Sequence, residues 1–232
     1  MLTVRRADDR GTFDHGWLQT AHTFSFGDYH DPKWTQFRAL RVMNEDTVAP
    51  GQGFGMHGHR DMEIITVVLS GTLSHRDSLG HEAALKPGEV QYMSAGTGIR
   101  HSEFNPSTNE PVHLYQIWLL PRQAGLTPRY EQRPYSVSNR QGCWQAVAAG
   151  DGREGAIPIQ QDATILLGEI AAGQSLTYDL PKSRHAWLQV MSGVVTVAGN
   201  ELFMGDGLAV SDQAGLTVAA TSLALVILFD LA

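Results

Sequence analysis

Two short motifs in the first half of the chain have the spacing of paired metal ligands. One contains His57 and His59, the other contains His101 and Glu103, and a single residue separates the members of each pair. Alternate residues of a β-strand face the same side, with Cα atoms roughly 6.5–7 Å apart, so each pair can direct both side chains to one ion. Imidazole and carboxylate both bind divalent transition metals. Glu63 follows the first motif closely and is a further candidate acid.

Both motifs are short enough to arise by chance in a chain with 10 histidines, so their surroundings carry the argument. Each follows a glycine-containing turn, at residues 51–55 and 96–98, and each opens a strand-like segment. The distance between them along the chain leaves room for several strands of one barrel. His75 and His81 flank a charged turn instead, and we expect them to be solvated loop residues.

Short strands joined by turns dominate the sequence around these motifs. Residues 62–69 and 113–120 are rich in β-branched, aliphatic and aromatic side chains, and they are followed by Ser-Gly and by Pro. The chain has 24 glycines, 10 prolines and only 18% charged residues, a composition that favours many short strands over long solvated helices. Turn signals recur at short intervals between the two segments, a pattern typical of a sandwich or closed barrel.

A polar, proline-containing stretch at residues 122–142 interrupts the strand pattern. We therefore predict two domains, residues 1–125 and residues 126–232. Both halves contain a strand, a glycine turn, a strand, a second glycine turn and a third strand, which indicates a duplicated barrel. The strands predicted in the second half are residues 164–170, 186–191, 194–198, 208–210 and 223–231.

The residues around the two histidine motifs resemble the paired sequence motifs of cupins. In the first motif the last gap is one residue longer than usual, whereas the second has the spacing Gly-x-x-His-x-x-x-Asn intact. The first consists of Gly51, His57, His59, Glu63 and Gly71, and the second of Pro87, Gly88, Gly98, His101 and Asn105.

A more specific resemblance is to the pirin family. It covers most of the first half in order, and the second half is similar mainly in architecture. The segments that carry it are residues 15–32 (HGWLQTAHTFSFGDYHDP), 54–64 (FGMHGHRDMEI), 94–106 (SAGTGIRHSEFNP) and 113–121 (HLYQIWLLP). The resemblance implies an all-β fold of two cupin (jelly-roll) β-barrels in tandem, a bicupin.

The same resemblance assigns the site. It implies that His57, His59, His101 and Glu103 are the metal ligands. In germin-type cupins Glu63 would be a ligand, but here we expect it to orient an imidazole through the second ring nitrogen. The other residues that we expect around the pocket are Met62, Met93 and Tyr115.

Four protein ligands leave one or two coordination positions for water, substrate or dioxygen. The donor set of imidazoles and a carboxylate suits Mn, Co, Ni, Cu or Zn as well as iron. Similarity to pirins makes Fe(II) our first expectation, with one ion per chain.

Pirin-like proteins are associated with quercetin 2,3-dioxygenase activity, in which a flavonol is cleaved by O2, carbon monoxide is released and a depside remains. The resemblance therefore implies a small phenolic or enolic substrate, and Glu103 is the expected catalytic base. An oxygenase with some other phenol or enol as its true substrate is a third hypothesis. The rival class is a metal-dependent regulatory module of the pirin type, which would bind a protein partner with little or no catalysis.

The second half departs from the cupin pattern. Alignment of its glycine turn places Asp179 and Pro181 where the His-x-His pair would be, and no His-x-Glu follows Gly207. We expect a structural or regulatory barrel without metal ligands there.

Charge and composition narrow the remaining function classes. A net charge of −7 disfavours direct binding of nucleic acid, which needs clustered Lys and Arg. Cys143 is the only cysteine, so no intrachain disulfide is available, and acidic residues stand where a signal peptide would have its apolar core. The longest apolar run, residues 223–229, is too short to span a membrane. We expect a cytoplasmic monomer.

Overall fold

The computed structural model describes all 232 residues, and its regular structure is almost entirely β-strand, with three short 3-10 turns at Ala7–Asp9, Val137–Asn139 and Arg153–Gly155. The chain forms two compact units. One, the metal-site barrel, comprises Gly11–Tyr135, and the other, the apolar barrel, comprises Met1–Arg10 together with Ser136–Ala232. The predicted all-β fold with two barrels in tandem is confirmed.

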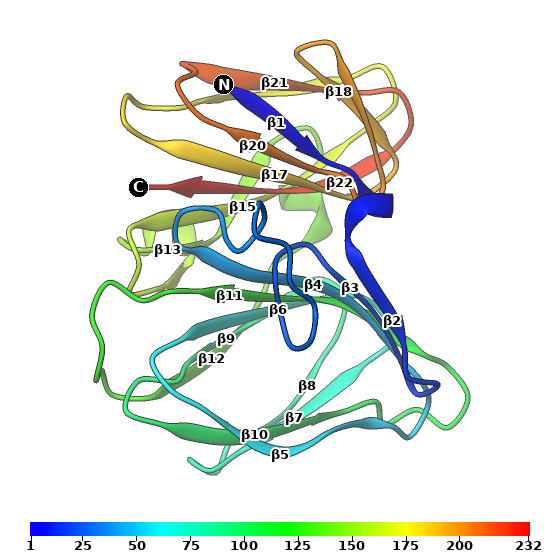
Figure 1. Cartoon of the computed structure of the whole chain (residues 1–232), viewed down its shortest axis with the longest axis vertical. Coiled ribbons are helices and arrows are strands. Elements are labelled where there is room, and N and C mark those ends of the chain that lie inside the picture. The colour runs from blue at the N-terminus through cyan, green and yellow to red at the C-terminus, as the bar shows by residue number, and fades with distance from the viewer. The chain divides into compact units, whose positions relative to one another are not determined.

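Two sheets form the metal-site barrel. The seven-stranded sheet has the order β12-β9-β6-β11-β4-β3-β2 and the four-stranded sheet the order β5-β10-β7-β8. In Figure 1 the sheet with β5 and β10 lies opposite the sheet with β4, β6 and β11. The strands are β2 (Gly11–Asp14), β3 (Leu18–His22), β4 (Leu40–Val48), β5 (Gly53–His59), β6 (Glu63–Ser70), β7 (Leu73–Asp77), β8 (Glu82–Leu85), β9 (Glu89–Ser94), β10 (Ile99–Phe104), β11 (Val112–Leu119) and β12 (Arg129–Pro134).

The apolar barrel has the same arrangement of a seven-stranded and a four-stranded sheet, except that its edge pair β13–β14 is parallel whereas β2–β3 is antiparallel. Its sheets have the orders β1-β20-β17-β22-β15-β13-β14 and β16-β21-β18-β19. The strands are β1 (Leu2–Arg5), β13 (Trp144–Ala149), β14 (Ile157–Pro158), β15 (Ala163–Ile170), β16 (Ser175–Asp179), β17 (His185–Ser192), β18 (Val194–Val197), β19 (Asn200–Phe203), β20 (Gly207–Val210), β21 (Gly215–Ala220) and β22 (Ala224–Leu231). Each of the strands predicted from the sequence has a counterpart here or in the metal-site barrel, with ends that agree to within one residue.

The domain boundary differs from the predicted one. The structure divides the chain after Tyr135 rather than after residue 125, and residues 1–10 belong with the second half. The cause is a pair of edge strands: β12 pairs with β9, and β1 pairs with β20. Because β12 is polar and only partly buried along its length, its sequence looks like a linker.

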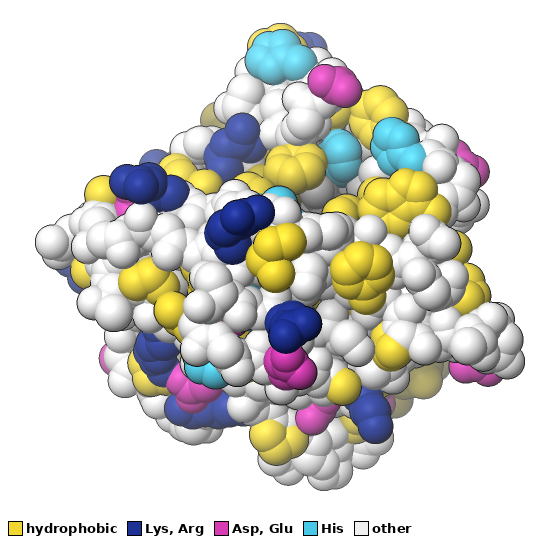
Figure 2. All heavy atoms as spheres, turned by 90° about the horizontal axis from the view of Figure 1, so that it is seen from below, with side chains coloured by type: hydrophobic (Ala, Val, Ile, Leu, Met, Phe, Trp, Pro, Cys, Tyr) yellow, Lys and Arg dark blue, Asp and Glu magenta, His cyan; other side chains and the backbone are white.

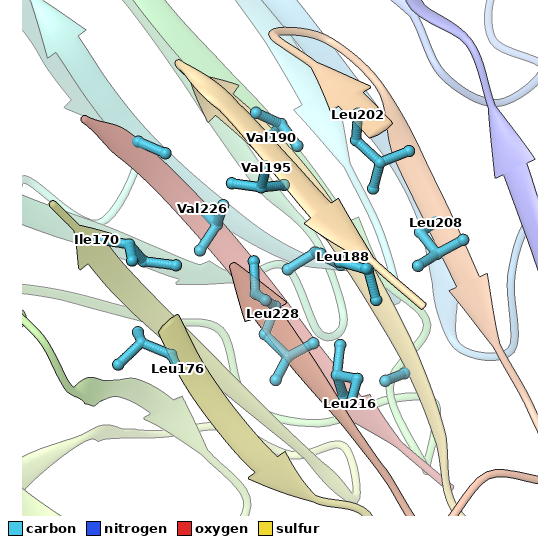
Figure 3. Close-up of a cluster of buried hydrophobic side chains, with 14 of the residues drawn as sticks. Ile170, Leu176, Leu188, Val190, Val195, Leu202, Leu208, Leu216, Val226 and Leu228 are labelled. Atoms are coloured by element: carbon cyan, nitrogen blue, oxygen red, sulfur yellow. The ribbon is translucent and has the colours of Figure 1, made fainter. Parts of the chain in front are cut away.

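Aliphatic side chains fill the apolar barrel. Figure 3 shows Leu188, Val190 and Val226 from two neighbouring strands pointing into a common cluster with residues of the other sheet, Val195 and Leu216 among them. Most of these side chains are fully buried, and each stabilises the fold by roughly 1.5–3 kcal/mol relative to an exposed position. The interior of this unit is therefore occupied by its own core.

The outer surface over β5 and β10 is mixed in character. Figure 2 shows Lys and Arg side chains scattered among acidic, histidine and apolar ones, without one continuous patch of a single charge. None of the helical segments has the length and hydrophobicity required to cross a bilayer.

Candidate metal centre

Strands β5 and β10 bring three histidines together. The strands are antiparallel neighbours, with His101 directly opposite His57 and Ile99 opposite His59. His101 Nε2 lies 2.9 Å from His59 Nε2 and 3.1 Å from His57 Nε2. A donor atom of each of the three rings lies within 4.8 Å of a donor atom of the others, as the spacing of the two sequence motifs predicted.

These distances fit a metal ion. Two donors in neighbouring positions of an octahedral ion, each about 2.1 Å from it, are separated by about 3.0 Å. A neutral imidazole also has only one proton to give, so His101 Nε2 is unable to donate to both of its neighbours at once. Three converging ring nitrogens are better accommodated by a cation than by hydrogen bonds among themselves.

The protonation states are those that a metal requires. His57 Nδ1 lies 2.8 Å from the carbonyl oxygen of Gly55, to which it donates, and this leaves Nε2 with a free lone pair. Burial and the neighbouring His57 lower the pKa of His59 to about 4. Burial, together with His57, His59 and His75, lowers the pKa of His101 to about 3. Both rings are therefore neutral near pH 7 and ready to bind a metal without losing a proton.

An irregularity in the β5–β10 pairing positions the next inward-facing residue. The register shifts between His101 and Glu103, so that β5 contributes one residue more than β10 at this point. Gly53 lies opposite Phe104, and a Cβ atom there would be 2.2 Å from the carbonyl oxygen of Glu103. Only glycine allows this approach.

Glu103 is deeply buried beside the histidines. Its carboxylate accepts hydrogen bonds from Gln91 (3.4 Å) and Gln116 (2.9 Å), and its nearest candidate ligands are His75 and His101. Burial raises the pKa of Glu103 to about 7, the two glutamine hydrogen bonds lower it, and the nearby Asp46 raises it. The carboxyl group is thus poised to gain or lose a proton near neutral pH.

Glu63, which we expected to orient a ligand imidazole, points away from the cavity. Glu63 is fully buried, and it accepts a 2.6 Å hydrogen bond from Tyr92 on the outer face of the sheet. The next residue, Ile64, lines the cavity instead. Because side chains alternate along a strand, a shift of one residue moves a side chain to the opposite face. Glu63 therefore does not orient a ligand imidazole in this structure.

The other predicted pocket residues also lie outside the cavity. Tyr115 donates a 2.9 Å hydrogen bond to Glu45 on the outer face. Met93 is buried in a small apolar cluster with Ile64, and Met62 packs against that cluster from its edge. These side chains support the barrel rather than line its pocket.

Aromatic residues form the walls of the pocket. The cavity has a volume of about 490 Å³, and the three histidines and Glu103 line it. Trp17 and Phe54 meet edge to face at 5.2 Å, and Trp118 lies 4.8 Å from His59 and 5.3 Å from Phe26. The site combines a corner of three histidines with an apolar, aromatic chamber.

A row of polar side chains crosses the inner face of the seven-stranded sheet opposite the histidines. Neighbouring strands pair at these positions, and hydrogen bonds run from Gln91 to Thr66, from Thr66 to Gln116, and from Gln116 to Glu103. A polar residue inside a mostly apolar strand, such as Thr66 in β6 or Gln116 in β11, is the sequence signal for such a row, but it does not show which face the residue takes. Its members, in strand order from β12 to β3, are Gln132, Gln91, Thr66, Gln116, Asn44 and His22.

His75 is not the solvated loop residue that its sequence context indicated. It lies on β7, is 2% exposed, and its Nε2 is 3.3 Å from Asp77 Oδ2. Tyr130 stacks on His75 at 4.7 Å and on His81 at 4.9 Å. His81 also contacts Asp77, at 2.9 Å, but its side chain remains substantially exposed. The prediction of a solvated residue therefore holds for His81 and not for His75.

Comparisons with known proteins agree with this geometry. The family model for pirin matches residues 3–119, and that for the quercetinase C-terminal cupin domain matches residues 146–231. The chain is 45% identical over 231 residues to the quercetin 2,3-dioxygenase of Escherichia coli K12, covering 100% of this chain and 99% of the relative. It is 40% identical over 233 residues to the pirin-like protein of Caulobacter vibrioides, with 100% of both covered.

Solved structures extend the likeness to three dimensions. Crystal structures of E. coli YhhW and of the bacterial pirin YhhW in complex with nickel(II) match with TM-scores of 0.97 and 0.95 and identities of 45% and 46%. The matches cover 100% of this chain in both cases, and 98% and 99% of the two structures. The chain belongs to the pirin family.

Proposed function

We propose that this protein is a metal-dependent dioxygenase of the quercetin 2,3-dioxygenase type, which cleaves a flavonol-type substrate with O2, releases carbon monoxide and leaves a depside. The observation that carries the proposal is the convergence of three imidazoles on the wall of an aromatic cavity. The name of the E. coli relative and the nickel(II) complex of YhhW support the same chemistry. Fe(II) is the ion that we propose for this chain.

The cavity suits a planar aromatic substrate. Its volume of about 490 Å³ lies within the usual range of roughly 300–1,000 Å³ for sites that bind small molecules. Trp17, Phe54 and Trp118 offer ring faces and edges to a flat ligand. These side chains would hold the substrate in one orientation beside the metal ligands.

His57, His59 and His101 would hold the ion, and Glu103 is the fourth ligand that we propose. When bound, the ion lowers the pKa of the substrate's enol hydroxyl and holds the two reactants together. Glu103 would take the enol proton on its carboxylate, because this buried acid lies beside the histidines that would hold the ion. Gln91 and Gln116 keep this carboxylate directed toward the interior through their amide hydrogen bonds.

The test is oxygen consumption by anaerobically Fe(II)-loaded protein on addition of quercetin, with carbon monoxide measured in the same vessel. We expect uptake and CO in equal amounts from the unmodified protein and neither from His101→Ala. Ser102→Ala is the matched control, because Ser102 neighbours His101 on β10 but alternates to the other face.

Full uptake by His101→Ala would reject the site. No uptake by unmodified protein that still binds one ion per chain would reject flavonol cleavage. That result would favour another phenolic or enolic substrate, or the regulatory module with a protein partner.

A further inference from the structure

Four polar side chains form a block on the inner face of β3 and β4. The strands pair so that Thr20 lies opposite Asp46 and His22 lies opposite Asn44. All four line the same cavity as the metal ligands, and their exposed fractions are only 4–8%. They belong to the seven-stranded sheet, whereas the histidines belong to the four-stranded sheet. We call these four residues the β3–β4 block.

Unlike the rest of the polar row, the block has unmet hydrogen-bonding capacity. Asn44 Oδ1 and Asp46 Oδ1 are buried and have no hydrogen-bond partner. The Thr20 hydroxyl lies close enough to the Asp46 carboxylate to lower its pKa but makes no well-formed hydrogen bond, whereas both carboxylate oxygens of Glu103 are bonded. A buried polar atom without a partner costs about 1–3 kcal/mol, and such atoms are rare in native proteins. Two of them together, in side chains that line a cavity, indicate that a ligand completes the site.

The unbonded atoms define the chemistry of this ligand. A carboxylate and an amide oxygen accept hydrogen bonds, and a threonine hydroxyl either accepts or donates, so the ligand must bring hydrogen-bond donors. His22 lies in an aromatic setting, 5.2 Å from Phe26, and burial lowers its pKa to about 4, so it adds no positive charge at neutral pH. The aromatic walls of the cavity complement a flat, unsaturated body. Phenolic hydroxyl groups on an aromatic ring satisfy both requirements.

We propose that the β3–β4 block is a second polar subsite, which binds the phenolic hydroxyl groups of the substrate while another part of the same molecule faces the histidines. This inference rests on the proposed function and deepens it. The subsite would select polyhydroxylated aromatic substrates over analogues that carry only the metal-facing oxygens. A site built to bond a hydroxyl group rejects the analogue that lacks it, because its own polar atoms then stay buried and unpaired.

The experiment measures binding rather than turnover. Dissociation constants of quercetin and of 3-hydroxyflavone, which shares the enol and ketone but lacks the ring hydroxyls, are determined without oxygen on metal-loaded protein. Thr20→Val and Asn44→Leu remove polar groups of the block at nearly constant volume, and circular dichroism checks their fold. Thr47→Val is the matched control, because Thr47 lies on β4 but faces away from the cavity.

We expect the unmodified protein and Thr47→Val to bind quercetin at least tenfold more tightly than 3-hydroxyflavone. Each block variant should lose about tenfold of that preference, the effect of roughly 1.4 kcal/mol, with little change for 3-hydroxyflavone. An unchanged preference in both folded variants overturns the subsite. So does the failure of the unmodified protein to bind either flavonol at millimolar concentration.

The two proposals fail separately. Absence of oxygen uptake with quercetin counts against the dioxygenase, whereas the ratio of the two dissociation constants reports on the subsite whether or not turnover occurs. A preference that survives in the unmodified protein without catalysis would keep the subsite and remove the reaction.

Discussion

The two barrels have the same strand order but opposite interiors. In each seven-stranded sheet, six neighbouring strands contribute one residue apiece to a row across the inner face. In the metal-site barrel the row is Gln132, Gln91, Thr66, Gln116, Asn44 and His22, and in the apolar barrel it is Val4, Leu208, Leu188, Leu228, Leu166 and Ala146. The four-stranded sheets differ likewise: the buried positions of β10 include His101 and Glu103, and those of β21 include Val218 and Ala220.

The comparison separates architecture from chemistry. A similar strand order surrounds a cavity in one barrel and a filled core in the other, so strand order alone does not determine function. The metal-site barrel tolerates buried acids and amides, which costs stability unless they are bonded. The apolar barrel instead gains stability from buried aliphatic area. Four predictions test this division.

The largest effect should come from making β10 resemble β21. His101→Ala removes the imidazole that contacts both other rings, so we expect metal affinity to fall by at least about 10³-fold, roughly 4 kcal/mol. Val218→Ala at the buried position of β21 should keep one metal per chain. Metal content after dialysis and calorimetric titration measure both. Equal metal loss from the two variants would contradict the view that only the metal-site barrel binds the metal.

The next effect concerns stability. Leu188 is fully buried at the centre of the apolar row, so Leu188→Ala should lower the free energy of unfolding by about 2–5 kcal/mol through lost burial and a new cavity. Denaturant titration with far-UV circular dichroism measures the change. Below the unfolding transition the variant should still bind metal. A loss of metal without a loss of stability would show that the apolar barrel serves the site directly.

A smaller effect on activity should follow from Glu103→Gln. The amide cannot accept the substrate proton, so we expect turnover to fall by about 10²-fold while the three histidines retain the metal. Steady-state oxygen uptake and metal analysis report the two quantities. Full turnover with full metal content would remove Glu103 from the role of base.

The smallest effect is a pH dependence of the metal-free protein. His22 has a folded pKa of about 4, below the usual 6.5, so the unfolded chain binds more protons as the pH falls. This residue therefore contributes no pH dependence above 6.5 and costs stability progressively between pH 6.5 and 4. As the pH falls from 6.5 to 4, the free energy of unfolding of His22→Gln should decrease by about 1–3 kcal/mol less than that of the unmodified protein. The measurement is denaturant titration of both proteins at several pH values. If their free energies of unfolding depend on pH in the same way, His22 does not have the lowered pKa.

Much of the fold and the centre of the site could be predicted from the sequence. The pairs around Gly58 and Ser102 lie on strands, where alternation alone places both members on one face, and turn residues set the strand ends closely. The faces of β6 and β11 could not be read in the same way. Glu63, Thr66 and Tyr115 all lie in nearly continuous buried strands, so the sequence pattern does not show which set points inward.

The remaining misses depended on contacts between distant segments. Trp17 and Phe54 meet only because the sheet that contains β4 and the sheet that contains β5 close on one another. The polar edge strand β12 was indistinguishable from a linker without its partner β9. His75 looked solvated because its neighbours in sequence are charged, although its ring is covered by Tyr130.

Strand β1 has a consequence for how the protein is made. It pairs with β20, almost the whole length of the chain away, so the metal-site barrel is topologically an insertion within the other unit. A ribosome would deliver every strand of the inserted barrel before the partner of β1 exists. The metal-site barrel can therefore fold during synthesis, whereas the apolar barrel is completed last and has a high contact order. Folding of the metal-site barrel thus does not depend on synthesis of the last strands of the chain.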